Sequence, residues 1–211
     1  MNTSRDNILA RLKVAQDHRG KIEVNIPDFT SPIYHTINQS LDLEFKCNLE
    51  LIGGEAIICQ DINEAIGQII QVCNKKNQHQ IFCKDPVLKE LLNGKLEIHS
   101  SEEDFKNLSI GLTGCEFLVA HLGSVLISSA QISGRRLNVF PETHLVIAYQ
   151  SQLTDYLDNA IKKLQEKYKN RLPSLISNIT GPSRTADIEK TLIMGMHGPK
   201  SLIVLIVKEQ D

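Results

Sequence analysis

The residues best suited to chemistry lie in one stretch near the end of the chain, Thr180–Lys200. It contains the sequence Gly-Pro-Ser-Arg-Thr at 181–185 and, further on, His197 between two glycines. Gly181 can adopt backbone conformations that other residues avoid, and Pro182 restricts its own φ, so we expect a rigid turn. An arginine, hydroxyl groups and an imidazole beside such a turn are the groups that bind a small anion or move a proton.

The elements around this turn are predicted from its flanks. The apolar runs Leu175–Ile179 and Leu202–Val207 predict a strand on either side. Thr185 is a suitable N-cap for a helix from Ala186 to about Gly195. Backbone N–H groups at a strand-to-helix turn, with Arg184 alongside, would cradle a phosphate or carboxylate. The alternative is a purely structural turn followed by a well-capped helix.

Three residues are candidates for catalysis, His197, Glu116 and His144. A histidine titrates near neutral pH, and a Glu–His pair would serve general acid–base chemistry if folding brought the two within hydrogen-bonding reach. The alternative for His197 is that its ring fixes the loop by bonding to backbone. The catalytic residues therefore remain undetermined at this stage, and no metal-ligand spacing surrounds His197.

Familiar nucleotide and hydrolase motifs are missing from the sequence. It has no G-x-x-x-x-G-K-[ST] loop, no G-x-G-x-x-G fingerprint and no G-x-S-x-G elbow. A standard ATPase, dinucleotide enzyme or hydrolase triad is therefore disfavoured.

Composition narrows the class of protein further. The 211 residues carry a formal net charge of -2, and aromatic residues make up 5% with no Trp, which disfavours nucleic-acid binding. The five cysteines are scattered and form no C-x-x-C pair, so we expect reduced thiols and no iron–sulfur cluster or other cofactor in this chain. No apolar run is long enough to span a membrane, and we expect a cytoplasmic protein.

The hydrophobic pattern predicts one α/β domain at 33–211, preceded by a helix and linker at 1–32. The helix covers Ser4–Asp17, and further helices are predicted at 32–49, 63–76 and 153–172. Strands alternate with helices up to about residue 98, which is typical of a mainly parallel sheet flanked by helices. Residues 117–128 read as a hairpin-like connection. Because ligands bind beyond the carboxyl ends of parallel strands, the turns at Gly111–Glu116 and Gly181–Thr185 are predicted to share that edge.

The motifs in the C-terminal half resemble the lactate-utilisation (LUD) domain family. The resemblance is carried by Gly181–Glu189, by Gly195-x-His-Gly-Pro199 and by the closing apolar strand, with Leu112–Gly114, Gly123–Ser124 and Pro141–His144 in the family's order. One difference is His121, where the family often has an acidic residue. The resemblance implies the sugar-isomerase and CoA-transferase-like α/β fold, shared with 5-formyltetrahydrofolate cyclo-ligase.

The same resemblance implies a function. Family members act with iron–sulfur partner proteins in oxidising L-lactate to pyruvate, so we expect an accessory subunit that binds a small anionic ligand. The alternative is a stand-alone enzyme acting on a phosphate- or CoA-bearing substrate. The predicted ligand-binding residues are Gly114, Ser124, Gly181, Pro182, Ser183, Arg184, Thr185, Asp187, His197 and Gly198.

Overall fold

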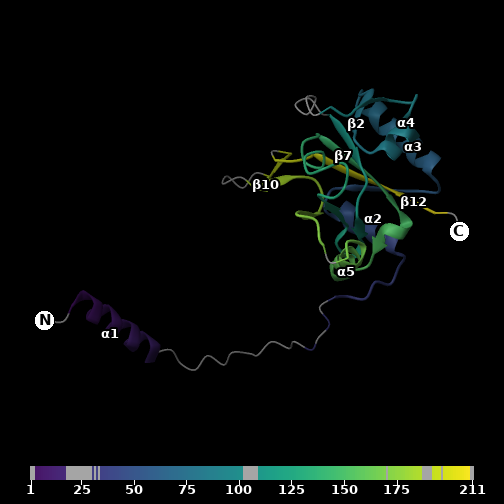
Figure 1. Ribbon diagram of the computed structural model, residues 1–211. Coiled ribbons are helices and arrows are strands. Elements are labelled where there is room, and N and C mark those ends of the chain that lie inside the picture. Colours follow the sequence, from purple (N-terminus) through teal and green to yellow (C-terminus); the bar gives the residue numbers. More distant parts are fainter. Residues whose placement is uncertain are drawn as a thin grey trace. The chain divides into compact units, whose positions relative to one another are not determined.

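The computed structural model describes residues 3–17, 30, 32, 34–101, 109–169, 171–186, 192–195 and 197–209 (Figure 1). The chain forms two compact units, residues 1–36 and 37–211. In the first unit α1 (Ser4–Asp17) has the predicted bounds, and all of its residues are exposed. The linker predicted at 18–32 lies outside the described residues except for positions 30 and 32, so the boundary at residue 32 stays a prediction.

A six-stranded parallel sheet forms the centre of the second unit. Its order is β1-β12-β7-β4-β2-β3, and every neighbouring pair is parallel, which confirms the predicted fold class. The strands are β1 (Glu55–Cys59), β2 (Gln80–Cys83), β3 (Glu97–His99), β4 (Ile110–Thr113), β7 (Thr143–Tyr149) and β12 (Ser201–Val207).

Helices α3 (Ile62–Lys75) and α4 (Pro86–Leu92) cover one face of this sheet (Figure 1). Each begins at an aspartate that accepts hydrogen bonds from the first turn. Asp61 accepts from the Glu64 N–H at 2.8 Å, and Asp85 accepts from the Val87 N–H at 2.9 Å. Such caps satisfy N–H groups that have no partner within a helix. The predicted helix at 32–49 was placed too early, because α2 spans Leu41–Leu51.

A second sheet of four strands lies opposite the other face. Its order is β8-β5-β6-β9, comprising β8 (Leu153–Thr154), β5 (Phe117–Val119), β6 (Ser124–Ser128) and β9 (Ile176–Ile179). The β5–β6 hairpin, closed by η2 (Ala120–Leu122), confirms the hairpin-like connection, although a second sheet was not predicted. The long helix predicted at 153–172 is shorter: Leu153–Thr154 pairs with β5, η3 (Gln150–Gln152) precedes it, and α5 spans Leu157–Lys167.

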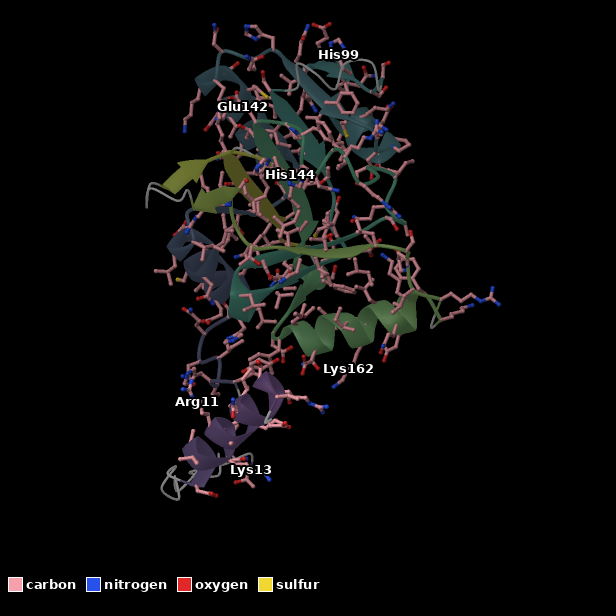
Figure 2. The ribbon with its side chains drawn as sticks, turned by 90° about the vertical axis from the view of Figure 1, so that its left-hand side faces the viewer. Arg11, Lys13, His99, Glu142, His144 and Lys162 are labelled. Atoms are coloured by element: carbon pink, nitrogen blue, oxygen red, sulfur yellow. The ribbon has the colours of Figure 1, made fainter. Side chains whose placement is uncertain are left out.

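The main core lies between the two sheets. Phe45 and Leu49 of α2 pack there against Leu118 and Val125 of the second sheet and Val146 of the first. A smaller core joins the outer face of the second sheet to α5. Figure 2 shows the resulting layers, with α5 on the far side of the second sheet.

The helix predicted at 186–195 is wrong, and so is the predicted cap at Thr185. The chain forms a two-stranded antiparallel hairpin, β10 (Arg184–Ala186) and β11 (Leu192–Met194), in which Arg184 pairs with Met194. Pairing across the hairpin satisfies backbone groups that the helix would have satisfied internally. A local capping signal cannot reveal a partner strand whose residues lie six to ten positions further along the chain.

Candidate functional site

The Gly181 turn and the His197 loop are held together by backbone hydrogen bonds. The Ser183 N–H donates to the Pro199 carbonyl at 2.8 Å, and the Gly195 N–H donates to the Ser183 carbonyl at 2.9 Å. Residue 200 leads directly into β12, so this assembly lies at the amino edge of the parallel sheet. The sequence-predicted association of Ser183 with the His197 loop is therefore present in the fold.

Glycines allow the turn to pack closely on the chain before β1. Gly181 has φ +84°, and a Cβ there would lie 3.0 Å from the Ile52 carbonyl oxygen. Gly53 has φ +83°, and a Cβ there would lie 2.9 Å from Nη2 of Arg184. Positive φ and close approach both favour glycine, so the Gly181 turn needs this residue type for structural reasons.

A pocket of about 310 Å³ opens beside His197. Among the described residues it is lined by Val139, Phe140, Gly195, His197 and Gly198. Phe140 is 59% exposed and Val139 is 46% exposed, which is unusual for large apolar side chains on one short segment. The pocket therefore combines an apolar wall with one exposed imidazole.

Lys200 and Glu142 form an ion pair at the same edge of the sheet. The Lys200 N–H donates to the Glu142 carbonyl at 2.8 Å, and Lys200 Nζ donates to the Glu142 carboxylate. That side-chain hydrogen bond lowers the pKa of Glu142. Both side chains are more than half exposed, so Glu142 is ionised and paired without being enclosed.

Arg184 does not line the pocket. Its guanidinium is exposed beside Gly53, and among the described residues it has no hydrogen-bonding partner. The predicted cradle of N–H groups at a helix terminus is absent, because a strand follows the turn and the Ser183 N–H is already bonded. Anion binding by Gly181, Pro182, Ser183 and Arg184 stays a prediction. Asp187 and the side chain of Thr185 lie outside the described residues.

Glu116 lies in a different place and has a full set of partners. Its side chain is completely buried and accepts from Ser128 Oγ at 2.5 Å, Tyr168 OH at 2.7 Å and Lys167 Nζ at 2.7 Å. Burial by itself would raise its pKa, but hydrogen bonds from Lys167, Ser128 and Tyr168 outweigh it and lower the pKa. A carboxylate with three donors, enclosed beneath α5, is a structural group and not an available base.

His144 is also enclosed. It is fully buried on β7, and its Nε2 lies 2.8 Å from Thr113 Oγ1. Burial lowers its pKa to about 4, so the ring is neutral at pH 7. Among the described residues, His144 makes no hydrogen bond to Glu116 or to His197. The predicted Glu–His pair among these three candidates is therefore not formed.

The two glycine-rich turns do not share an edge of the sheet, contrary to the prediction. Gly114 follows the carboxyl end of β4, whereas the Gly181 turn contacts residues before the amino ends of β1 and β12. Ser124 is fully buried on β6, and His121 lies 5.4 Å from the Tyr156 ring, centroid to centroid. Neither Ser124 nor His121 lines the His197 pocket.

Sequence reasoning missed the pocket's apolar wall. Val139 and Phe140 directly precede Pro141, in a stretch to which the sequence analysis assigned no element. The available signal was an apolar pair that continues neither a strand nor a helix pattern. An apolar pair outside any strand or helix pattern has no predicted place in the core, which indicates that its side chains lie at the surface.

With this geometry established, the chain can be compared with known proteins. Residues 43–207 match the sequence model of the LUD domain. The chain belongs to the LUD domain family. This confirms the resemblance inferred from the motifs and extends it over most of the second unit.

Curated relatives have names that refer to lactate. The chain is 32% identical over 114 residues to lactate utilization protein C 1 of Bacillus mycoides, covering 52% of this chain and 49% of that protein. It is likewise 32% identical over 114 residues to lactate utilization protein C of Bacillus subtilis, covering 52% and 48%. The matched part thus spans about half the length of these LUD-domain relatives.

A solved structure supports the fold. The crystal structure of a DUF162 family protein from Deinococcus radiodurans superposes with a TM-score of 0.61 at 16% identity, covering 79% of this chain and 96% of that one.

The part of the chain that the structure describes lacks two kinds of feature. No helix there is long and apolar enough to cross a membrane. No group of three or more His, Cys, Asp or Glu side chains in the same part of the chain is arranged to hold a metal ion. Four of the five cysteines are buried and Cys47 is exposed, all as free thiols.

Proposed function

We propose that this LUD-domain chain is an accessory subunit of a cytoplasmic system that oxidises L-lactate to pyruvate, acting with iron–sulfur partner proteins. The observation that carries the proposal is the family match over residues 43–207, together with relatives named lactate utilization protein C. The state of the catalytic candidates also favours a subunit. Glu116 is saturated by donors, and burial lowers the pKa of His144 to about 4, so both are weak bases at pH 7.

The proposal includes a small anionic ligand at the amino edge of the parallel sheet. Arg184 supplies an exposed guanidinium with no hydrogen-bonding partner among the described residues, and His197 supplies a second polar group at the neighbouring pocket. A carboxylate is the group that an arginine recognises best after phosphate. L-lactate and pyruvate both carry one.

Reconstitution tests the subunit role. Lactate-dependent dye reduction would be measured with the iron–sulfur partner proteins, with and without this chain. We expect activity only when the chain is present, and no turnover of lactate, ATP or a CoA thioester by the chain alone. Turnover of ATP or a CoA thioester by the isolated chain would instead establish the stand-alone enzyme.

Calorimetry tests the anion site. Arg184→Ala is expected to weaken L-lactate binding by about tenfold, the usual effect of losing one charge-assisted hydrogen bond. Arg171→Ala removes another exposed arginine, from the segment after α5, and serves as the matched control. Equal L-lactate affinities for the two variants would show that Arg184 does not contribute to ligand binding.

A further inference from the structure

Two buried polar atoms have no partner among the described residues, and one of them belongs to Asn138, which directly precedes the pocket residue Val139. They are Nδ1 of His144 and Oδ1 of Asn138, on side chains that are 0% and 2% exposed. Burying a polar atom without a hydrogen bond is unfavourable, so native proteins keep few of them and often keep them where a ligand or water binds. A third such atom, Ser124 Oγ, belongs to the second sheet.

His144 lies in a row of side chains that crosses the parallel sheet. Strand pairing aligns Phe82, Gly111, His144 and Leu202 on adjacent strands. A Cβ on Gly111 would lie 2.8 Å from Pro141 Cγ and 2.9 Å from Leu137 Cδ1. The segment Leu137–Pro141 therefore occupies the space that a side chain at Gly111 would take, beside the position of His144 in this row.

The same segment forms the apolar wall of the pocket. Leu137, Asn138 and Pro141 are buried, whereas Val139 and Phe140 between them are exposed and line the pocket with His197. His144 is two residues beyond the exposed Glu142, which directly precedes β7, a separation of roughly 7 Å. Figure 2 shows Glu142 toward the periphery and His144 deeper in the domain. The segment Leu137–Pro141 thus links the pocket, through Val139 and Phe140, to the buried Asn138 and to the row that holds His144.

We propose that the ligand site extends past Val139 and Phe140 to an inner hydrogen-bonding position formed by Asn138 and His144, which receives the hydroxyl group of a small hydroxy acid. Asn138 Nδ2 donates to the Gly134 carbonyl at 2.9 Å, which leaves its Oδ1 as an acceptor. An acceptor selects a ligand that carries a donor. The bond between His144 Nε2 and Thr113 fixes the ring, so that Nδ1 keeps one orientation.

This inference rests on the proposed function, since it specifies the ligand of the same site. It predicts discrimination between two acids of equal charge and similar size. L-lactate has a hydroxyl that can donate to Asn138, whereas pyruvate has a keto oxygen that cannot. A site built to bond a hydroxyl discriminates against an analogue without it, because its own polar groups then stay unpaired.

Calorimetry with the full-length chain provides the test, using L-lactate and pyruvate as probes. We expect L-lactate to bind at least about tenfold more tightly than pyruvate. Asn138→Leu should lower the affinity for L-lactate to that for pyruvate and leave pyruvate binding unchanged. Ile132→Ala removes an exposed apolar residue of the same connection, outside the pocket lining, and should preserve the preference. Equal binding of the two acids, or binding of neither, overturns the inference.

A second measurement does not depend on the variant folding. In ¹⁵N-labelled wild-type protein, the Nδ1 resonance of His144 should shift when L-lactate is added and stay in place when pyruvate is added. An unchanged resonance at saturating L-lactate overturns the inner position. The subunit role would survive that result, because reconstituted lactate oxidation measures it separately.

Discussion

Two glutamate–lysine pairs in this domain have the same chemistry and opposite surroundings. Glu116 and Lys167 meet beneath α5, where the carboxylate is fully buried and has two further donors. Glu142 and Lys200 meet at the amino edge of the parallel sheet, where both side chains are more than half exposed. The first pair lies in the hairpin region of the second sheet, and the second borders the candidate ligand site.

The difference shows how burial divides structural from available groups. Around Glu116 three donors are committed to the carboxylate, and its removal would leave the buried Ser128 hydroxyl and the half-buried Tyr168 hydroxyl without that acceptor. Around Glu142 water can replace either partner at little cost. Residues that look equally reactive in the sequence therefore have different roles, and four measurements test this contrast.

The largest expected effect is at Gly123, in the hairpin region. A Cβ there would overlap the backbone of Asn48 and Leu49 in α2, and Gly123 also has φ +58°. We expect Gly123→Ala to lower the free energy of unfolding by about 4 kcal/mol, as strain and overlap combine. Urea denaturation measures this. Gly67→Ala, with nothing within 4 Å in the interior of α3, should instead stabilise by roughly 1 kcal/mol.

The next effect concerns pH and His144, two residues beyond Glu142. Burial lowers its pKa from 6.5 to about 4. Between these two pH values the imidazole is protonated in the unfolded chain and neutral in the folded protein. Its contribution to stability is therefore present above about pH 6.5 and lost as pH falls toward 4, by about 3 kcal/mol in total. Unfolding free energies at several pH values should show this loss in the wild type and not in His144→Gln. Parallel curves would contradict the assignment.

A direct comparison of the two glutamates comes third. We expect Glu116→Ala to cost about 2 kcal/mol and Glu142→Ala less than about 0.5 kcal/mol, because the Glu116 carboxylate is buried even though Lys167 is half-exposed, whereas both members of the Glu142–Lys200 pair are exposed. Because the pKa of Glu116 is lowered, its contribution is present at neutral pH and is lost in acid. In acid, the two variants should therefore differ less in their free energy of unfolding than they do at neutral pH. Equal costs at neutral pH would show that burial does not separate the two pairs.

The smallest effect is at Gly181, in the candidate site. Its φ is positive, but a Cβ would only approach the Ile52 carbonyl to 3.0 Å. We expect Gly181→Ala to destabilise by about 1 kcal/mol, mostly from the left-handed conformation. Thermal denaturation is the measurement. A loss as large as that of Gly123→Ala would mean that the turn is as tightly enclosed as the hairpin.

Much of the fold was predictable because its signals are local. The caps at Asp61 and Asp85, the apolar run of β12 and the periodicity of α3 each depend on residues close in sequence. The failures have a common cause. Both the β10–β11 hairpin and β8 are short strands stabilised by pairing with a partner, which local pattern does not encode.

The candidate site was predictable only in part. The association of Ser183 with the His197 loop follows from the motifs and is present in the fold. The pocket wall at Val139 and Phe140 was missed, and Glu116 was taken for a candidate base because its partners Ser128, Lys167 and Tyr168 are distant in sequence.

From the residues alone it follows that the chain is a LUD-domain α/β protein, that its central sheet is mainly parallel, and that Gly181 and His197 belong to one region. These properties depend on motifs and periodicity among residues that are close in sequence. The position of the Gly181 turn at the amino edge, away from Gly114, is visible only in the folded domain, and so is the contrast between the saturated Glu116 and the exposed Glu142. Strand order and burial are set by contacts between distant segments, and these contacts decide which polar groups remain available to a ligand.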